Sequence, residues 1–422
     1  MEQIKSYTLD NNITILAEHI PHIQSILLGL WVKEGSRVEK KPQYGIAHFV
    51  EHMLFKGTKK RNSKQIAESL ELIGGDLNAF TSREHCCYYA KAISEETNLV
   101  FDVISDIVFN SLFDAEEMDK ERTVIAQEIG MYDDSPEELA HEHLVQTMYG
   151  DGLGHPVIGY KKNVDSFKQQ EVLDFHQKFY NPSNVFISVV GNFDNYSIED
   201  LSKKYFSHIP TIKTPSFKKQ IEAKKHGIKS IVKPIEQCHL TLGWHAYNIT
   251  HENRYVLHLI SAYLGGGMSS LLFQDIRENH GLTYSIYSFV RAYKDVGFFG
   301  IYSAHSKEST QKILELTKKN IEKIMNGELT QEKLSQLKSQ LKGGLLLGLE
   351  KTSFRMNRIG VGHLYFDKVM STEELIELVN KVNPEDIIRV ALEVFTQKPS
   401  IINVGNLDQS ELEVAIKESK II

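Results

Sequence analysis

The chain has 422 residues, of which 41% are hydrophobic and 24% are charged, and its net charge is −7. This is the composition of a globular protein with enough residues for more than one hydrophobic core. An acidic chain whose Lys and Arg residues are scattered argues against nucleic acid or an anionic membrane as a partner.

The first residues, MEQIKSYTLDNNITILAEH, predict a strand, a turn at 10–12 and a second strand. They contain neither the apolar stretch of a signal peptide nor an Arg-rich presequence. No window approaches 18 uninterrupted apolar residues, the length that predicts a membrane-spanning helix. The cysteines are Cys86, Cys87 and Cys238, an odd number with two adjacent, which argues against a disulfide framework. We therefore expect a cytoplasmic protein with no membrane partner.

The segment GIAHFVEHMLFKGT (45–58) places His48, Glu51 and His52 on one face of a predicted helix. Two imidazoles at positions i and i+4 can bind one cation, which is the helical geometry of a zinc site. Zinc lowers the pKa of a bound water toward about 7, and a glutamate within the same span can polarise that water. The motif alone leaves an alternative open, in which hydrogen-bonded histidines and a surface glutamate form the wet face of a helix.

A catalytic zinc site needs a third protein ligand. The segment MDKERTVIAQEIGMY offers Glu121 and Glu128, which are seven residues apart and therefore lie on the same face of a predicted helix. Both are candidates for the third ligand.

The two halves of the chain resemble each other. VFISVVGNFD (185–194) is similar to PSIINVGNLD (399–408), and Gly191 and Gly405 are 214 positions apart. Further strands and helices recur at similar spacing, which indicates a duplicated domain. Short turns between strands and separate blocks of helices predict an α+β fold of two tandem homologous domains. Each is expected to be a mainly antiparallel sheet with helices packed on one face.

The H-x-x-E-H motif, followed by a glutamate further along, resembles the inverted-motif zinc peptidases. These include pitrilysin, insulin-degrading enzyme and mitochondrial processing peptidase, and the resemblance is strongest to short bacterial processing-peptidase-like members. It covers essentially the whole chain. It implies that His48, His52 and Glu128 bind one Zn²⁺ per chain, that Glu51 is the general base, and that Glu121 supports the site or assists catalysis.

Two further segments carry the resemblance. LNAFTSREH is similar to the Asn-Ala-x-Thr edge strand of the family, which implies that Asn78, Ala79 and Phe80 pair with a peptide substrate. An exposed strand edge also has a physical reason to bind extended peptides, through main-chain hydrogen bonds. RENHGLTYS resembles the Arg-x-x-x-Gly-Leu-x-Tyr element, which implies substrate binding by Arg277 and Tyr284.

The second half departs from the pattern of a metal site. It contains no H-x-x-E-H, and Gly344 lies near the position that corresponds to Glu128, while Leu271 stands where relatives often carry Arg. We therefore expect a catalytic domain at 1–210, a linker at 211–227, and an inactive homologous domain at 228–422 that completes the substrate chamber.

The sequence thus predicts a zinc metalloendopeptidase that cleaves peptides or extended protein segments. The first alternative is a catalytically inactive structural or assembly subunit of a processing-peptidase-like complex, and the second is a metal-binding protein without peptidase activity. The chain is about half as long as the family's single-chain chambers, which implies a homodimer.

Overall fold

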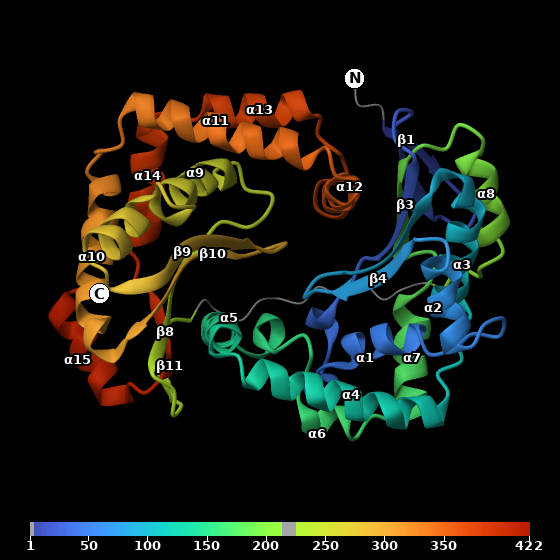
Figure 1. The fold of residues 1–422 in the computed structure, drawn as a ribbon, viewed down its shortest axis with the longest axis horizontal. Coiled ribbons are helices and arrows are strands. Elements are labelled where there is room, and N and C mark those ends of the chain that lie inside the picture. The colour runs from blue at the N-terminus through green and yellow to red at the C-terminus, as the bar shows by residue number, and fades with distance from the viewer. Residues whose placement is uncertain (1–3, 213–224) are drawn as a thin grey trace. The chain divides into compact units, whose positions relative to one another are not determined.

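A computed structural model describes residues 4–212 and 225–422, so most of the predicted linker at 211–227 lies outside the described residues. These residues form two compact units (Figure 1). Unit 1 contains residues 4–130, 155–212 and 347–369, and unit 2 contains residues 131–154, 225–346 and 370–422. Each unit therefore includes one segment from the other half of the sequence.

Among the described residues, the sheet of unit 1 has six strands in the order β1-β2-β6-β3-β5-β4. Their bounds are β1 (Ile4–Thr8), β2 (Thr14–His19), β3 (Ser25–Val32), β4 (Asp76–Thr81), β5 (Cys86–Ile93) and β6 (Val185–Gly191). Neighbouring strands are antiparallel except β2 and β6, which run parallel. The strand β4 therefore lies at one edge of the sheet.

The central strand β3 has the sequence SILLGLWV and is buried along almost its whole length. Because side chains of a strand alternate between the two faces, such an uninterrupted apolar run must be covered on both sides. On one face Leu28 and Leu30 join the main core of the unit. On the other face Leu27 and Trp31 pack in a separate cluster.

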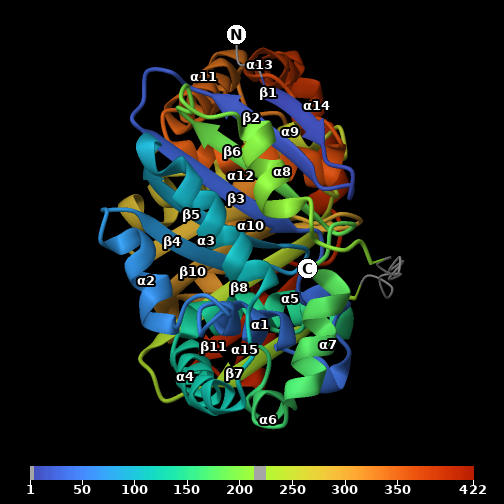
Figure 2. The same cartoon turned by 90° about the vertical axis from the view of Figure 1, so that its right-hand side faces the viewer.

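The helices of unit 1 cover both faces of its sheet. The main core is closed by α1 (Ile46–Leu54), α3 (Thr97–Phe109), α7 (Gln169–Phe179) and α8 (Ile198–Phe206). Figure 2 shows α3 and α8 in front of the strands. The other face is covered by α12 (Thr352–Phe366), whose Met356 and Ile359 pack in the cluster of Trp31.

The contact between α12 and β3 is close. A Cβ atom added at Gly360 would lie 2.2 Å from the ring of Trp31, so a larger residue at this position would push the helix off the sheet. The indole N–H of Trp31 donates to Ser188 Oγ at 2.8 Å, which satisfies its polar group in this buried cluster.

Among the described residues, the sheet of unit 2 has five strands in the order β7-β11-β8-β10-β9. Their bounds are β7 (Ile228–Val232), β8 (Gln237–Ala246), β9 (Thr283–Ala292), β10 (Gly297–Ser306) and β11 (Ser400–Gly405). Only β7 and β11 are parallel neighbours in this sheet. The order and directions repeat those of β2-β6-β3-β5-β4 in unit 1, as the sequence duplication predicts, and β1 has no counterpart among the described strands of unit 2.

Helices also cover both faces of the second sheet. One face packs against α9 (Arg254–Gly265), α10 (Thr310–Met325), α14 (Pro384–Phe395) and α15 (Gln409–Ser419). The other face packs against α5 (Pro136–Gly154), which comes from the first half of the chain and contributes Leu144, Met148 and Tyr149. The colours of Figure 1 show the exchange: the orange-red α12 lies with blue strands, and the teal α5 lies with yellow and red strands.

The remaining α-helices are α2 (Ser63–Glu71), α4 (Ala115–Asp133), α6 (Lys161–Val164), α11 (Gln331–Gly348) and α13 (Thr372–Lys381). Several helices begin at a side chain that accepts a hydrogen bond from the first turn. Asn62 accepts from the N–H of Gln65 at the start of α2, and Asp408 accepts from the N–H of Glu411 at the start of α15, both at 2.9 Å. These caps explain why the helices begin at these residues.

The predicted class, with two homologous α+β units and mainly antiparallel sheets, is thus the class observed. One detail differs: the sequence predicts helices on one face of each sheet, and the structure has helices on both faces. The physical reason is that β3 in unit 1, and β10 and β11 in unit 2, carry apolar side chains on both faces, which would otherwise contact water.

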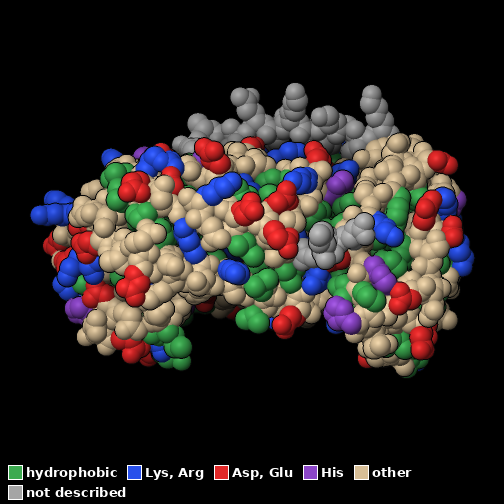
Figure 3. Space-filling view, turned by 90° about the horizontal axis from the view of Figure 1, so that it is seen from above, with side chains coloured by type: hydrophobic (Ala, Val, Ile, Leu, Met, Phe, Trp, Pro, Cys, Tyr) green, Lys and Arg blue, Asp and Glu red, His purple; other side chains and the backbone are tan. Residues whose placement is uncertain are grey.

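The charged side chains on the face shown in Figure 3 are interspersed. Lys and Arg alternate with Asp and Glu there, and no large area formed by described residues on this face carries one sign of charge.

Because α12 comes from the second half of the chain, a fragment of the first half should lack one layer of its packing. The chain has two tryptophans, Trp31 and Trp244, so the fragment 1–212 reports on Trp31 alone. Without α12, the face of Leu27 and Trp31 should contact water, and the fluorescence of Trp31 should shift to longer wavelength. Adding a synthetic peptide of residues 347–369 should shift it back, whereas a peptide with Met356→Asp should not. Emission typical of buried tryptophan from the fragment alone would contradict the role given to α12.

Candidate metal centre

The helix α1 separates apolar from polar side chains along its length. Its apolar residues are all buried: Ile46, Ala47, Phe49, Val50, Met53 and Leu54. The remaining positions are His48, Glu51 and His52, which lie on the opposite side because a helix turns about 100° per residue. Burial of one side thus fixes the direction in which these three side chains point.

Glu128, on α4, faces the two histidines. Its Oε2 lies 3.4 Å from His52 Nε2 and 3.8 Å from His48 Nε2. The two imidazole rings have centroids 4.6 Å apart. In the described part of the chain these three residues form the one group whose donor atoms lie close enough together to hold a metal ion, all within 4.8 Å of one another.

Glu121 lies two turns before Glu128 on the same helix and contacts the back of the site. Its Oε2 is 2.9 Å from His52 Nδ1, and its Oε1 is 2.5 Å from Lys56 Nζ. With its Nδ1–H donated to Glu121, His52 turns its other ring nitrogen, Nε2, toward Glu128. This is the arrangement in which a carboxylate orients a metal-binding histidine.

The two histidines have opposite electrostatic environments. Burial and the neighbouring His52 lower the pKa of His48 to about 4, so this ring is neutral. Burial also lowers the pKa of His52, but the hydrogen bonds and charges of Glu121 and Glu128 outweigh it and raise its pKa to about 9. The hydrogen bond from His52 also lowers the pKa of Glu128, despite partial burial.

The residues present fit a divalent cation such as zinc. Two imidazole nitrogens and one carboxylate oxygen are a donor set of catalytic zinc sites, which leave a further position open. The Nδ1 atom of His48 is buried and has no hydrogen-bond partner among the described residues. The charge of a cation would also replace the proton that the two glutamates now hold on His52.

Glu51 points from α1 toward the strand β4, where Thr81 Oγ1 donates to its Oε2 at 2.5 Å. Burial raises the pKa of Glu51, and the hydrogen bond from Thr81 only partly opposes this effect. A carboxylate with a raised pKa is a stronger base.

The three residues expected to pair with a peptide lie on β4, which is the edge strand next to α1. The N–H of Ala79 donates to the side chain of Asn78 at 2.8 Å. The ring of Phe80 packs edge-on against Trp31, with centroids 5.8 Å apart. All three residues thus belong to the edge strand, with Phe80 packed against Trp31 and Ala79 against the main core.

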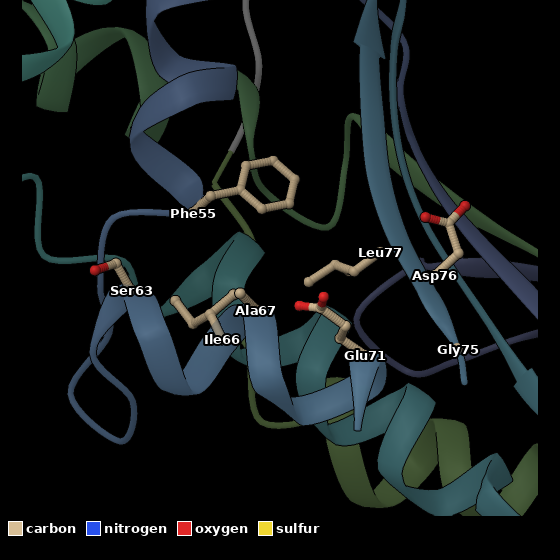
Figure 4. A pocket seen from close by; sticks show the side chains of 8 residues that line it. All are labelled: Phe55, Ser63, Ile66, Ala67, Glu71, Gly75, Asp76 and Leu77. Atoms are coloured by element: carbon tan, nitrogen blue, oxygen red, sulfur yellow. The ribbon is translucent and has the colours of Figure 1, made fainter. Parts of the chain in front are cut away.

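A hollow of about 360 Å³ lies beside the start of β4 (Figure 4). It is lined by Phe55, Ser63, Ile66, Ala67, Glu71, Gly75, Asp76 and Leu77. Figure 4 shows the side chains of Phe55, Leu77 and Glu71 converging on it, whereas the carboxylate of Asp76 points away. The hollow thus has a mixed polar and apolar lining, with the carboxylate of Glu71 facing it.

Arg277 and Tyr284 belong to unit 2 and contact each other. Arg277 lies on a π-helix, Phe273–Asn279, and its guanidinium stacks between the rings of Phe273 at 4.6 Å and Tyr284 at 4.7 Å. Tyr284 is 78% exposed, at the start of the edge strand β9. The structure therefore brings the two residues of this predicted element together on a surface.

Thr81 and Lys56 contact the site but are not among the residues that the sequence predicts for it. Thr81 was visible as the last residue of the Asn-Ala-x-Thr segment, but its bond to Glu51 joins positions 30 residues apart. Lys56 follows His52 by four residues, a spacing that could have suggested a contact near Glu121.

The fold and this group of side chains define a class of proteins with two homologous α+β units, of which one carries a His-His-Glu group that could hold a metal ion. A family model described as "Insulinase (Peptidase family M16)" matches residues 14–161, and one described as "Peptidase M16 inactive domain" matches residues 166–341. A Bacillus subtilis protein named "Uncharacterized zinc protease YmxG" is 38% identical over 396 residues, which cover 93% of this chain and 96% of that protein. The chain belongs to peptidase family M16, and the predicted resemblance is confirmed.

Two solved structures share the fold. One, described as a protease from Helicobacter pylori, has a TM-score of 0.89 at 22% identity and covers 96% of this chain and 100% of that chain. The other, described as a peptidase M16 inactive domain from Pseudomonas fluorescens, has a TM-score of 0.88 at 19% identity, with 96% and 98% covered. At these identities the likeness shows the fold alone, and it confirms the predicted fold class. Within 4–212 and 225–422, the helices are too short or too polar to cross a membrane.

The raised pKa of His52 predicts that metal binding releases protons. Because this pKa rises from 6.5 to about 9, His52 carries a proton at about pH 6 that a bound cation must displace, whereas His48 carries none. At this pH we expect release of about one proton per zinc, and an apparent affinity that falls about tenfold per unit of pH from about 7 to about 5. Calorimetry in two buffers of different ionisation enthalpy measures this release. Glu121→Gln should reduce it, and zinc binding without proton release in the wild type would contradict the assignment.

Proposed function

We propose that this chain is a zinc-dependent endopeptidase that hydrolyses peptides and extended segments of proteins. The observation that carries the proposal is the convergence of His48, His52 and Glu128 next to Glu51 and the edge strand β4, all within unit 1. The name of the Bacillus subtilis relative, a zinc protease, supports it.

In this proposal His48, His52 and Glu128 hold one zinc ion per chain, and Glu121 orients His52 through its Nδ1. When bound, zinc supplies a Lewis acid that lowers the pKa of a coordinated water toward about 7. Glu51 acts as the general base. Because Thr81 holds its Oε2, its Oε1 is left to accept a proton from water and to pass it to the leaving amine.

The substrate is an extended peptide that adds to the edge of β4. Main-chain groups of a peptide can pair with any free strand edge, so recognition of this kind favours unfolded segments over folded proteins. A substrate carbonyl would replace Asn78 as the acceptor of the Ala79 N–H. The hollow beside β4 would accept a side chain with an apolar stem, and Glu71 would favour Lys or Arg at its end over an acidic group.

We assign Arg277 and Tyr284 to substrate binding and to stabilisation of the charge that develops on the scissile carbonyl. Their stacking holds a guanidinium and a phenol hydroxyl next to each other, and both can donate hydrogen bonds to an oxyanion. We further propose a homodimer in the cytoplasm. The described cysteines Cys86, Cys87 and Cys238 are buried thiols, which suits a reducing compartment.

A catalytically inactive subunit is the alternative. The match to the inactive-domain model spans 166–341, whereas Glu51, Glu128 and the two histidines lie within the match at 14–161. Because the four residues lie outside the match to the inactive-domain model, we favour an active first unit joined to an inactive second unit.

Glu51→Gln should keep zinc and lose turnover. The amide has the same shape but cannot accept a proton, and removal of a general base costs about 10²–10⁴ in rate. The measurement is hydrolysis of a quenched fluorescent peptide library alongside zinc content by elemental analysis. Glu95→Gln, the same change at an exposed position of unit 1, is the matched control. Normal hydrolysis by zinc-loaded Glu51→Gln protein would assign the base to another residue.

Arg277→Ala and Tyr284→Phe should each lower kcat by about 10²–10³, because donors of this kind act mainly in the transition state. Zinc content and Tm should stay near those of the wild type, since the side chain of Tyr284 is largely exposed. Arg254→Ala removes another arginine of unit 2 that stacks on a tyrosine, Tyr255, and should leave kcat unchanged. If Arg277→Ala and Arg254→Ala lowered kcat equally, the role proposed for Arg277 would be wrong.

A further inference from the structure

The helix α1 begins against a buried carboxylate. Glu39 is 1% exposed, and both of its oxygens accept hydrogen bonds from the helix start: Oε2 from the N–H of Gly45 and Oε1 from the N–H of Ala47, each at 2.8 Å. The first N–H groups of a helix have no partner within the helix, and its N-terminus attracts negative charge. Glu39 supplies both the acceptors and the charge.

A histidine from a distant part of the sequence holds Glu39 in place. His155 Nε2 lies 3.0 Å from Glu39 Oε2, and His155 is 2% exposed. Its ring stacks on Tyr44, with centroids 3.8 Å apart and an angle of 7° between the planes. Since Tyr44 directly precedes Gly45, His155 contacts both the carboxylate and the chain that leads into α1.

Two backbone segments, 44–45 and 158–159, also pass very close to each other at the start of α1. Gly45 and Gly159 both have positive φ, +99° and +77°. A Cβ at Gly45 would lie 2.7 Å from the carbonyl oxygen of Ile158, and a Cβ at Gly159 would lie 2.3 Å from that of Tyr44. Side chains cannot fit between the two segments, so the start of α1 has little freedom to shift.

The two histidines of the metal centre differ in what orients them. His52 is held by a hydrogen bond to Glu121. The Nδ1 of His48, in contrast, has no hydrogen-bond partner among the described residues, so no such bond sets the direction of this ring. The direction of His48 is therefore left to its backbone and to the packing of its ring against His52. The residue before it, Ala47, is the one whose N–H is bound by Glu39.

We propose that Glu39 and His155 are positioning residues for the metal centre: by fixing the first turn of α1 they direct His48 toward the ion and so set the metal affinity. This inference rests on the proposed function, because it concerns the zinc ion that His48 would bind. It differs from simple helix capping, which would change the stability of the fold and leave the geometry of the centre unchanged.

The test uses the full-length chain after removal of metal. Zinc affinity is measured by competition with a chromophoric chelator, and Co²⁺ is added as a probe whose visible absorption reports ligand geometry. Glu39→Gln keeps the shape of the side chain but presents an amide N–H to one of the two backbone N–H groups. We expect it to weaken zinc binding about 10–100-fold, as loss of an orienting contact does, and to alter the Co²⁺ spectrum. His155→Gln, which keeps a donor toward Glu39, should lose less affinity than His155→Leu.

Asp408→Ala is the matched control. It removes the carboxylate at the start of α15 in unit 2, so it should lower Tm and leave zinc affinity and the Co²⁺ spectrum unchanged. A folded Glu39→Gln protein with wild-type affinity and spectrum would overturn the inference. If neither Glu39→Gln nor Glu39→Asp folds, the pair serves stability and the inference is also overturned. A wild-type protein that binds no zinc would instead overturn the proposed function.

Discussion

The rest of the structure depends on one constraint: each sheet contains strands that are apolar on both faces, β3 in unit 1 and β10 and β11 in unit 2. A strand of this kind needs a layer of side chains on each side. In unit 1 the second layer is α12, which seats Met356 and Gly360 against β3, and in unit 2 it is α5. Because each helix comes from the other half of the sequence, neither half alone contains a complete unit, although the duplication divides the chain into two.

The same burial organises the metal centre. The apolar side of α1 belongs to the main core of unit 1, so its polar side must face α4 and β4. Each reactive group then has its own orienting contact: Glu121 for His52, Thr81 for Glu51, and the anchored backbone for His48. Two carboxylates, Glu121 and Glu128, lie beside the two imidazoles and favour a positive charge at this place. A divalent cation brings two positive charges, whereas a proton brings one.

The two units have diverged from a common plan. The first carries the H-x-x-E-H helix, whereas the second has Gly344 in the corresponding long helix and presents Arg277 and Tyr284 instead. The family model for an inactive domain matches much of this second part. Membership of family M16 therefore describes the whole chain, and the proposed chemistry is carried by a few residues of the first unit. The proposed preference for extended substrates comes from the free edge of β4.

The sequence by itself determined the local features: His48, Glu51 and His52 share a helix face, Glu121 and Glu128 share another, and repeated strand patterns define two homologous α+β units. These follow from the helical and strand periods, which act over a few residues. Only the tertiary structure decided which helix covers which sheet, that Thr81 holds Glu51, and that His155 holds Glu39. These contacts join residues far apart in the chain, and no local period connects them. They exist because packing two-sided sheets brings distant segments together, and burial then requires each polar group to find a partner.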